Sequence, residues 1–444
     1  WGECYSIENT DSLDLYNSGL TLTGEIPSTI GNLTNLTFLS LGGNELTGSI
    51  PPEIGNLTNL EVLSIWGNNL TGDLPSEIGN LANLSHLYLG GNELAGEIPI
   101  EIWSLTNLSN LGLSDNQFTG ELTSEIGNLT NMVNLQFQNN QLTGSIPPEI
   151  GNLTNLVHLS ISSNQLTGEI PSDIGNLTNL ERFYLKYNQL TGEIPLEIGN
   201  LTNMTNLIFD GNQLIGEIPL EIGNLTNLTQ LSLDGNQLTG EIPIEIWSLT
   251  NLNTLWLGIN QLTGEISPEI GNLTNLTKLR LGDNQLTGEI PESICDLINL
   301  IWVSNYDSLE YSNSTIYMNQ LCPPYPSCIE EYVGEQDTSN CEQVSIIDET
   351  LPITFNLYNA YPNPFNPVTT LRYDLPEDAV VNITIYDMMG RQVNTLINNQ
   401  QTAGYKTVEW NATNDIGKPV SAGVYLYQIR AGEFVQTKKM ILLK

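Results

Sequence analysis

The sequence predicts a repeat solenoid of the α/β type, followed by a small all-β sandwich. Two observations predict the solenoid: Asn recurs every 24 residues from Asn44 to Asn284, and a Leu-x-Leu pair precedes it in most repeats. A third observation separates the end of the chain, because residues 1–300 hold 34 acidic and 4 basic residues whereas residues 360–444 hold 7 and 8. We therefore expect two parts with different folds.

The composition limits the classes of partner. The 444 residues carry a net charge of −38, which opposes binding to nucleic acid or to an anionic membrane, because both need a basic surface. No apolar run approaches the ~18 residues of a membrane-spanning helix. Trp1 begins the chain without the charged and then apolar profile of a signal peptide. We therefore expect a mature form from which a leader has been removed.

Residues 1–24 are expected to form an N-terminal cap, with Leu20 where a further Asn of the series would fall, because end repeats depart from the common frame. Residues 25–300 are expected to form 24-residue repeats. In each repeat the Leu-x-Leu pair predicts a short strand of a parallel concave β-sheet, and the later apolar positions close a mostly irregular or 3-10 convex side. One repeat cannot bury its own leucines, so the repeats must stack.

The recurring Asn is expected to form a ladder along the solenoid. Its amide can both donate and accept hydrogen bonds, so it can satisfy backbone groups where the chain leaves the strand. Gly recurs with the same period from Gly24 to Gly288 and supplies conformational freedom at a turn.

Residues 301–345 are expected to form a C-terminal cap, in which Asn319 continues the ladder after an irregular spacing. Four cysteines lie where the last turn would expose its core: Cys295, Cys322, Cys328 and Cys341. Disulfides can seal such an end, and four cysteines allow three pairings, of which we favour Cys295–Cys322 with Cys328–Cys341. Zinc is the poorer interpretation, because no His lies nearby. Cys4 is left without a predicted partner.

Residues 346–359 are expected to be a linker, and residues 360–444 a β-sandwich. The run Y-P-N-P-F-N-P begins at Tyr361 and excludes regular structure there. Alternating apolar residues between Gly, Pro, Asn and Asp turns follow it, for example at Ile383 and Ile385, and this pattern is typical of short antiparallel strands.

The repeated L-T-G-x-I-P segment resembles the leucine-rich-repeat family in its plant-type variant, found in plant receptor-kinase ectodomains and polygalacturonase-inhibiting proteins. The resemblance covers residues 20–321. The opening W-G-E-C followed by L-D-L is similar to the family's N-terminal cap, with one cysteine of its usual pair. The resemblance implies a right-handed solenoid that presents a concave sheet.

Residues 360–444 resemble the C-terminal sorting domain of the type IX secretion system of Bacteroidetes and related bacteria. The resemblance rests on Y-P-N-P-F-N-P, I-Y-D-M-M-G-R, a G-V-Y strand and the last strand with K-K-M. It implies an extracellular or outer cell-surface location on a Gram-negative bacterium, secretion machinery as a partner, and usually cleavage within residues 342–359. The alternative is an ordinary β module that helps the solenoid to bind.

Acidic residues form two columns, five and nine residues after the ladder position, as at Glu97 and Glu53. Adjacent coils lie about 4.8 Å apart, so the carboxylates would stack near the ~5 Å separation of a retaining glycosidase pair. A catalytic pair needs two different environments, however, and a repeated column supplies one. We expect a solvated acidic surface with at most weak Ca²⁺ association. Since nucleophile, phosphate-binding and zinc-protease motifs are all missing, we expect neither an enzyme nor a cofactor.

The residues six, four and two places before each ladder Asn must face outward from their strand. They include every basic residue of 1–300, and aromatic residues with Arg are the usual composition of binding hot spots. We predict that the ligand-binding residues on this concave face are Trp66, His86, Tyr88, His158, Arg182, Tyr184, Lys186, Trp256, Lys278 and Arg280, together with Tyr187, which lies one place before its Asn.

Three details of this face are also predicted. Arg280 is expected to stack on Trp256 of the preceding coil, and Lys186 to pair with Asp210 of the following coil. A metal site is not expected, because the two histidines lie three coils apart and cannot share one ion.

These observations predict a secreted or surface-attached protein that recognises a protein or peptide partner, in adhesion or cell-surface recognition. The alternative is a polysaccharide- or glycan-binding protein, because exposed aromatic rings can stack on sugars. A lower alternative is a structural surface-layer or ice-contacting array that uses a column of Thr from Thr34 to Thr274.

Overall fold

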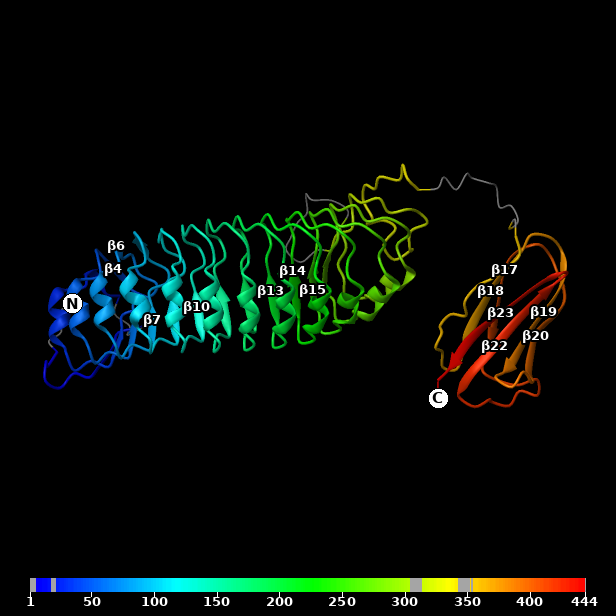
Figure 1. The fold of residues 1–444 in the computed structure, drawn as a ribbon, viewed down its shortest axis with the longest axis horizontal. Coiled ribbons are helices and arrows are strands. Elements are labelled where there is room, and N and C mark those ends of the chain that lie inside the picture. Colours follow the sequence, from blue (N-terminus) through cyan, green and yellow to red (C-terminus); the bar gives the residue numbers. More distant parts are fainter. Residues whose placement is uncertain (1–4, 17–20, 304–313, 342–351, 353, 444) are drawn as a thin grey trace. The chain divides into compact units, whose positions relative to one another are not determined.

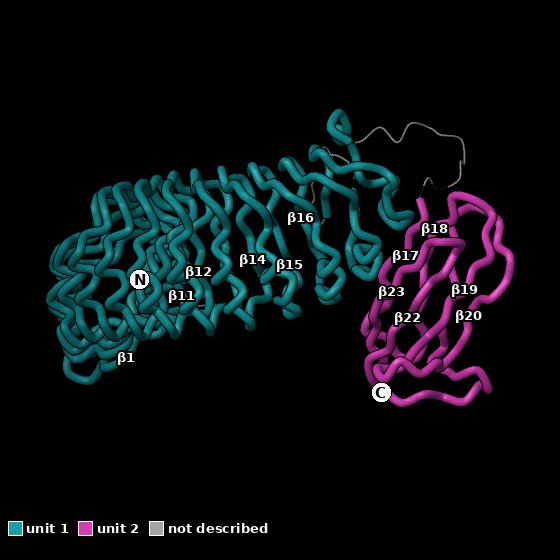
Figure 2. Tube along the Cα trace, turned by 45° about the vertical axis from the view of Figure 1, so that its right-hand side comes forward, with its two compact units in different colours: residues 1–341 teal, residues 342–444 magenta. Residues whose placement is uncertain are grey.

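The computed structural model describes residues 5–16, 21–303, 314–341, 352 and 354–443. The chain divides into two compact units, residues 1–341 and residues 342–444 (Figure 2). In the described ranges, no helix is long and apolar enough to span a bilayer. The predictions for Trp1, Cys4 and Leu20 concern positions outside those ranges.

The first unit is built on one parallel sheet, to which each coil contributes a three-residue strand (Figure 1). Neighbouring strands pair with the 24-residue offset of the repeat, so that His158 pairs with Arg182. The first strand pairs with an offset of two further residues, Ser12 with Phe38, as expected for an end repeat. The strands, in sheet order, are β1 (Ser12–Asp14), β3 (Phe38–Ser40), β5 (Val62–Ser64), β7 (His86–Tyr88), β9 (Asn110–Gly112), β10 (Asn134–Gln136), β11 (His158–Ser160), β12 (Arg182–Tyr184), β13 (Asn206–Ile208), β14 (Gln230–Ser232), β15 (Thr254–Trp256) and β16 (Lys278–Arg280).

The return path of each coil ends in a five-residue 3-10 helix, and these helices stack along the solenoid (Figure 1). Short second strands and single bridges lie between the ladder Asn and the helix, among them β2 (Thr23–Glu25), β4 (Glu45–Thr47), β6 (Thr71–Asp73) and β8 (Glu93–Ala95). The predicted 3-10 character of this side is confirmed. The helices are η1 (Ser28–Asn32), η2 (Pro52–Asn56), η3 (Ser76–Asn80), η4 (Ile100–Ser104), η5 (Ser124–Asn128), η6 (Pro148–Asn152), η7 (Ser172–Asn176), η8 (Leu196–Asn200), η9 (Leu220–Asn224), η10 (Ile244–Ser248), η11 (Pro268–Asn272) and η12 (Glu292–Asp296).

The Asn ladder works as predicted. Nδ2 of Asn68 donates to the carbonyls of Leu41 and Ile65, at 3.0 and 3.1 Å, and Oδ1 accepts from the backbone N–H of Leu46 at 3.0 Å. Asn68 is 6% exposed, so an apolar replacement would leave buried backbone groups unpaired. Asn319 repeats this arrangement in the cap, where it binds the carbonyl of Leu281.

The predicted disulfide pairing is wrong. The structure joins Cys295 to Cys328 and Cys322 to Cys341, with Cα–Cα distances of 5.7 and 5.5 Å. The reason is that the cap continues the solenoid for one more coil: Cys322 forms a bridge with Glu289, which carries the following residues, including Cys328, over η12 and its Cys295. Position within the coil, not closeness in sequence, decides which cysteines meet.

The second unit consists of two antiparallel sheets around one apolar core that includes Phe365, Trp410 and Tyr427. This confirms the predicted small all-β fold. Its first strand lies within residues 346–359, which the sequence analysis placed in a linker. One sheet contains β17 (Asn356–Leu357), β18 (Thr369–Leu375) and β21 (Gly404–Trp410), and the other β20 (Gln392–Gln401), β19 (Ala379–Asp387), β22 (Gly423–Ala431) and β23 (Phe434–Leu442).

Candidate binding surface

The outward residues of the twelve-stranded sheet form a continuous surface, which we call the sheet face. It consists of the residues six, four and two places before each ladder Asn. The alternation predicted from the sequence is present: Leu87 is buried, while its neighbours His86 and Tyr88 are partly exposed. Three groups of side chains stand out along this face.

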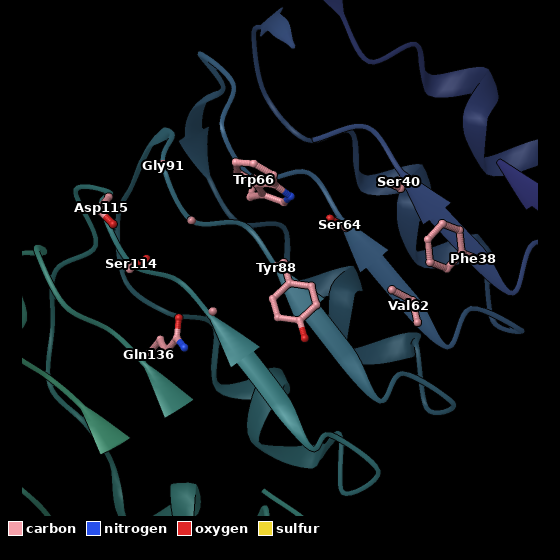
Figure 3. A pocket seen from close by; sticks show the side chains of 12 residues that line it. Phe38, Ser40, Val62, Ser64, Trp66, Tyr88, Gly91, Ser114, Asp115 and Gln136 are labelled. Atoms are coloured by element: carbon pink, nitrogen blue, oxygen red, sulfur yellow. The ribbon is translucent and has the colours of Figure 1, made fainter. Parts of the chain in front are cut away.

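The first group is an open hollow of about 530 Å³ near the N-terminal end, which we call the aromatic hollow (Figure 3). Trp66 is 43% exposed, and its indole lies over Gly42, where an added Cβ would come within 2.7 Å of Nε1. Tyr88 lies over Gly112, where a Cβ would come within 3.3 Å of the ring. Burial raises the pKa of Tyr88, so the phenol stays neutral at pH 7. The hollow is lined by Phe38, Ser40, Val62, Ser64, Trp66, Tyr88, Gly90, Gly91, Gly112, Ser114, Asp115 and Gln136.

The second group surrounds His158 in a hollow of about 390 Å³, which we call the histidine hollow. The imidazole packs edge-on against Tyr184, with ring centroids 5.3 Å apart. Burial, and the charge of Arg182, lower the pKa of His158 and keep it neutral at pH 7. Its Nε2 and the Oγ of Ser162 are buried polar atoms without a hydrogen-bond partner in the described structure. Such atoms favour a ligand or water that completes their hydrogen bonds.

The third group, near the C-terminal end, is a charged cluster. Arg280 stacks on Trp256, with the guanidinium carbon 4.1 Å from the ring centroid, which confirms the predicted stack. Its Nη1 also lies 3.3 Å from a carboxylate oxygen of Asp234, whose other oxygen accepts from the backbone N–H of Gly258 at 2.6 Å. Trp256 is 9% exposed, so the cluster is part of the interior and is not an open surface.

Two neighbouring carboxyl groups of this cluster are perturbed. Burial raises the pKa of Asp210 to about 6, although Ser232 donates a hydrogen bond to it. Burial and the negative charge of Asp210 raise the pKa of Asp234 to about 7, and together these effects outweigh the opposing Arg280. Both acids lie two places before their ladder Asn, in adjacent coils.

The predicted pair between Lys186 and Asp210 is wrong. Among the described residues, the ion pairs are Arg280 with Asp234 and Arg391 with Asp387. Asp210 is 8% exposed and is held by Ser232, whereas the ammonium of Lys186 lies 5.6 Å from the ring centroid of Tyr187. Burial of the acid in the sheet face keeps the flexible lysine outside.

The residues predicted to bind a ligand therefore lie at three separate places along the sheet. Trp66 and Tyr88 line the aromatic hollow, and His86 lies beside it, 6.0 Å from the ring of Tyr88. The other predicted residues lie at the histidine hollow or the charged cluster: His158, Arg182, Tyr184, Lys186 and Tyr187 at the former, and Trp256, Lys278 and Arg280 at the latter.

Sequence reasoning missed the small and acidic residues that shape these places. Gly90 and Gly112 form the floor of the aromatic hollow, and Asp210 with Asp234 forms the core of the charged cluster. Both signals were present in the same columns, as glycines beside aromatic residues and as two successive acids. The role of these glycines and acids becomes visible only when each residue is compared with the residue 24 places away, which is its neighbour in the next coil.

The acidic columns lie on the return path of the coils. Glu217, Glu241 and Glu265 are exposed, and their bridges to the next coil hold them in register. Within the described ranges, no group of three or more His, Cys, Asp or Glu could hold a metal ion. Weak association of cations with these columns stays a prediction.

Family models match most of the chain. A leucine-rich repeat region matches residues 13–116 and 100–210, and a further leucine-rich repeat model matches residues 227–249 and 275–297. A secretion system C-terminal sorting domain matches residues 359–443. The search of curated proteins gave no match.

Solved structures give the same result for the first unit. The ectodomain of the Arabidopsis thaliana receptor kinase GASSHO1/SCHENGEN3, in complex with CASPARIAN STRIP INTEGRITY FACTOR 2, is 35% identical, with a TM-score of 0.61 over 73% of this chain and 43% of that one. The Arabidopsis receptor kinase HAESA, in complex with the peptide hormone IDA, is 31% identical, with a TM-score of 0.60 over 71% and 60%. This chain thus spans less than two thirds of either ectodomain.

This chain covers a larger share of one similar bacterial structure than of the plant receptors. A leucine-rich-repeat protein of Leptospira interrogans is 35% identical, with a TM-score of 0.54 over 71% of this chain and 80% of that one.

Proposed function

The chain belongs to the leucine-rich-repeat proteins and ends in a secretion sorting domain, and from this premise we propose that it is an exported, surface-attached protein that binds a polypeptide partner on its sheet face. The observation that carries the proposal is the distribution of charge. All four basic residues of 1–300, amid 34 acidic ones, lie in the outward columns of the sheet. Arg182 and Lys186 are exposed there, Lys278 is half-buried, and Arg280 is held by Asp234. The complex of the similar plant receptor kinase HAESA with a peptide hormone supports a polypeptide as the ligand.

The two hollows suit different parts of an extended segment. The aromatic hollow can take an apolar side chain between Trp66 and Tyr88, since aromatic rings at an open site supply large contact area. The histidine hollow can hydrogen-bond a backbone amide or a polar side chain through Nε2 of His158 and Oγ of Ser162, the two atoms that lack partners in the described structure. Tyr88 on β7 and His158 on β11 lie three coils, or about 14 Å, apart, a distance that about four extended residues span.

A binding experiment tests the proposal. The full chain is immobilised, binders are selected from a random peptide library, and affinities are measured by calorimetry. Tyr88→Ala and Tyr184→Ala should each weaken binding about tenfold or more. Glu121→Ala and Glu149→Ala, on the acidic columns, should not change it.

The outcome that contradicts the proposal is a set of binders whose affinity depends on the acidic columns and not on the tyrosines. A glycan array probed in parallel distinguishes the glycan alternative, which predicts sugar binding that Tyr88→Ala abolishes and no selected peptide. Deletion of residues 360–444 tests the export step, because the shortened protein should remain inside the cell.

A further inference from the structure

An exposed apolar stripe lies on the return path of three consecutive coils. Leu196, Leu220 and Ile244 are each 59% exposed and occupy the first position of η8, η9 and η10. We call these three residues the aliphatic stripe. The three helices are neighbours in the stack (Figure 1). The same position of successive coils therefore presents a continuous row of large apolar side chains to solvent.

The repeat frame does not require an apolar residue here. In eight other helices this position holds a small, cyclic or charged residue, and in η4 it holds the isolated Ile100. The eight are Ser28, Pro52, Ser76, Ser124, Pro148, Ser172, Pro268 and Glu292. Because those coils close with the same buried Ile and Leu, the stripe contributes little to the core. A cluster of large exposed apolar residues marks an interaction surface more often than a scattered one does.

Acidic residues border the stripe on both sides. A hollow of about 1160 Å³ contains Leu220 and Ile244 and is lined by Glu217, Glu221, Glu241, Glu245 and Glu265, with no basic residue in its lining. The occupant must therefore combine apolar groups along its middle with positive charge along its edges. An acidic ligand or an anionic membrane would be repelled.

The spacing of the coils suits a helix. Beside the stripe, Glu217 and Glu241 bridge to the next coil as parallel β partners, so adjacent coils are about 4.8 Å apart there. The pitch of an α-helix is about 5.4 Å, so side chains at i, i+4 and i+7 of a helix can meet three successive coils. The part of this chain that the structure describes contains no α-helix, so a second copy of it does not supply the occupant.

We propose that the aliphatic stripe is a second docking surface, which receives an amphipathic helix of a partner protein whose apolar side is flanked by Lys or Arg. This surface is separate from the sheet face. It explains why apolar residues replace serine and proline in three successive coils, and it gives the acidic columns around them a role in selecting the partner.

The test uses the full chain and a designed helix as the probe. The probe has about 18 residues, Leu at i, i+4, i+7 and i+11, and Lys on both flanks. Its affinity is measured by fluorescence anisotropy. The triple variant Leu196→Ser/Leu220→Ser/Ile244→Ser should bind at least about tenfold more weakly. Since serine occupies the same position in other coils, the variant should fold normally, which circular dichroism checks. Ile100→Ser is the matched control and should bind like the unmodified protein.

Two further probes separate docking from simple charge attraction. A scrambled peptide of the same composition, without an apolar side, should bind at least about tenfold more weakly than the designed helix, and a Glu-flanked helix should not bind. Equal binding of the scrambled peptide, or unchanged binding by the folded triple variant, would overturn the proposal. Tyr88→Ala should leave this binding unchanged. A loss in that variant would place the probe on the sheet face instead and would also overturn it.

Discussion

The aromatic hollow and the charged cluster lie on the same sheet face, and each contains one tryptophan, yet the two tryptophans behave differently. Trp66 is 43% exposed and Trp256 is 9% exposed. In their own columns, Trp66 stands between Gly42 and Gly90, whereas Trp256 stands between Ser232 and Arg280. The residues 24 places before and after thus decide whether a side chain on this face is an open anchor or part of the interior.

The largest expected effect is a difference in stability between the alanine variants of the two tryptophans. Trp256→Ala removes a buried ring and uncovers Arg280, so it should lower the free energy of unfolding by about 3 kcal/mol or more. Trp66→Ala removes an exposed ring and should cost under about 1 kcal/mol. Urea unfolding followed by circular dichroism measures both. Trp256 and Arg280 were predicted from sequence as ligand-binding residues, and both side chains are largely buried in the structure. Equal losses from the two variants would remove the distinction between the regions.

Removal of a disulfide from the C-terminal cap should affect the stability of the two regions unequally. Cys295 and Cys328 tie the last coil to the cap, and removing a disulfide of this loop length costs about 3 kcal/mol. In a solenoid each coil stabilises its neighbours, so Cys295→Ser/Cys328→Ser should lower amide protection around Trp256 more than around Trp66. Hydrogen exchange with mass spectrometry measures both places in one sample. A uniform loss along all coils would instead indicate that the solenoid unfolds as one unit.

The pH dependence of stability should also distinguish the charged cluster from the aromatic hollow. The pKa values of Asp210 and Asp234 are raised to about 6 and about 7 from an unfolded value of 3.8. Their protonated forms therefore favour the folded state, and this contribution is lost as the pH rises through 6 to 7. Between pH 6 and pH 8 the ionisation of these two groups should lower the free energy of unfolding by about 2 kcal/mol.

The double variant Asp210→Asn/Asp234→Asn isolates this effect. Its stability should fall less between pH 6 and pH 8 than the stability of the unmodified chain. Asp115→Asn, at the exposed rim of the aromatic hollow, controls for the removal of a charge beside the sheet face. If the double variant loses as much stability with pH as the unmodified chain, the acids are not the cause.

The repeat frame was predictable because the same residue types recur at the same positions of every coil. Asn68 and Leu87 have the partners and burial that period and alternation imply, and the sorting domain carries its own motifs. The disulfide pairing was not predictable, because Cys328 reaches Cys295 only once the cap has continued the coil. The roles of Asp210 and Leu220 were missed for a related reason: each depends on what stands at the same position in neighbouring coils.

The smallest effect concerns two glycines that occupy the same position, two places before the ladder Asn. A Cβ at Gly258 would lie 3.0 Å from the carbonyl oxygen of Gly282 and 3.3 Å from the carboxylate of Asp234, and neither can move without disturbing the charged cluster. A Cβ at Gly90 would lie 2.9 Å from the hydroxyl of Ser114, which can rotate away, and 3.2 Å from the carbonyl oxygen of Ser114, a looser backbone contact than the one at Gly258. Gly258→Ala should therefore cost about 1–2 kcal/mol, as overpacking does, and Gly90→Ala about 0.5 kcal/mol or less. Both values follow from urea unfolding at pH 7. A Gly90→Ala variant as unstable as Gly258→Ala would mean that the floor of the aromatic hollow is as tightly packed as the charged cluster, and the hollow would then not be an open site.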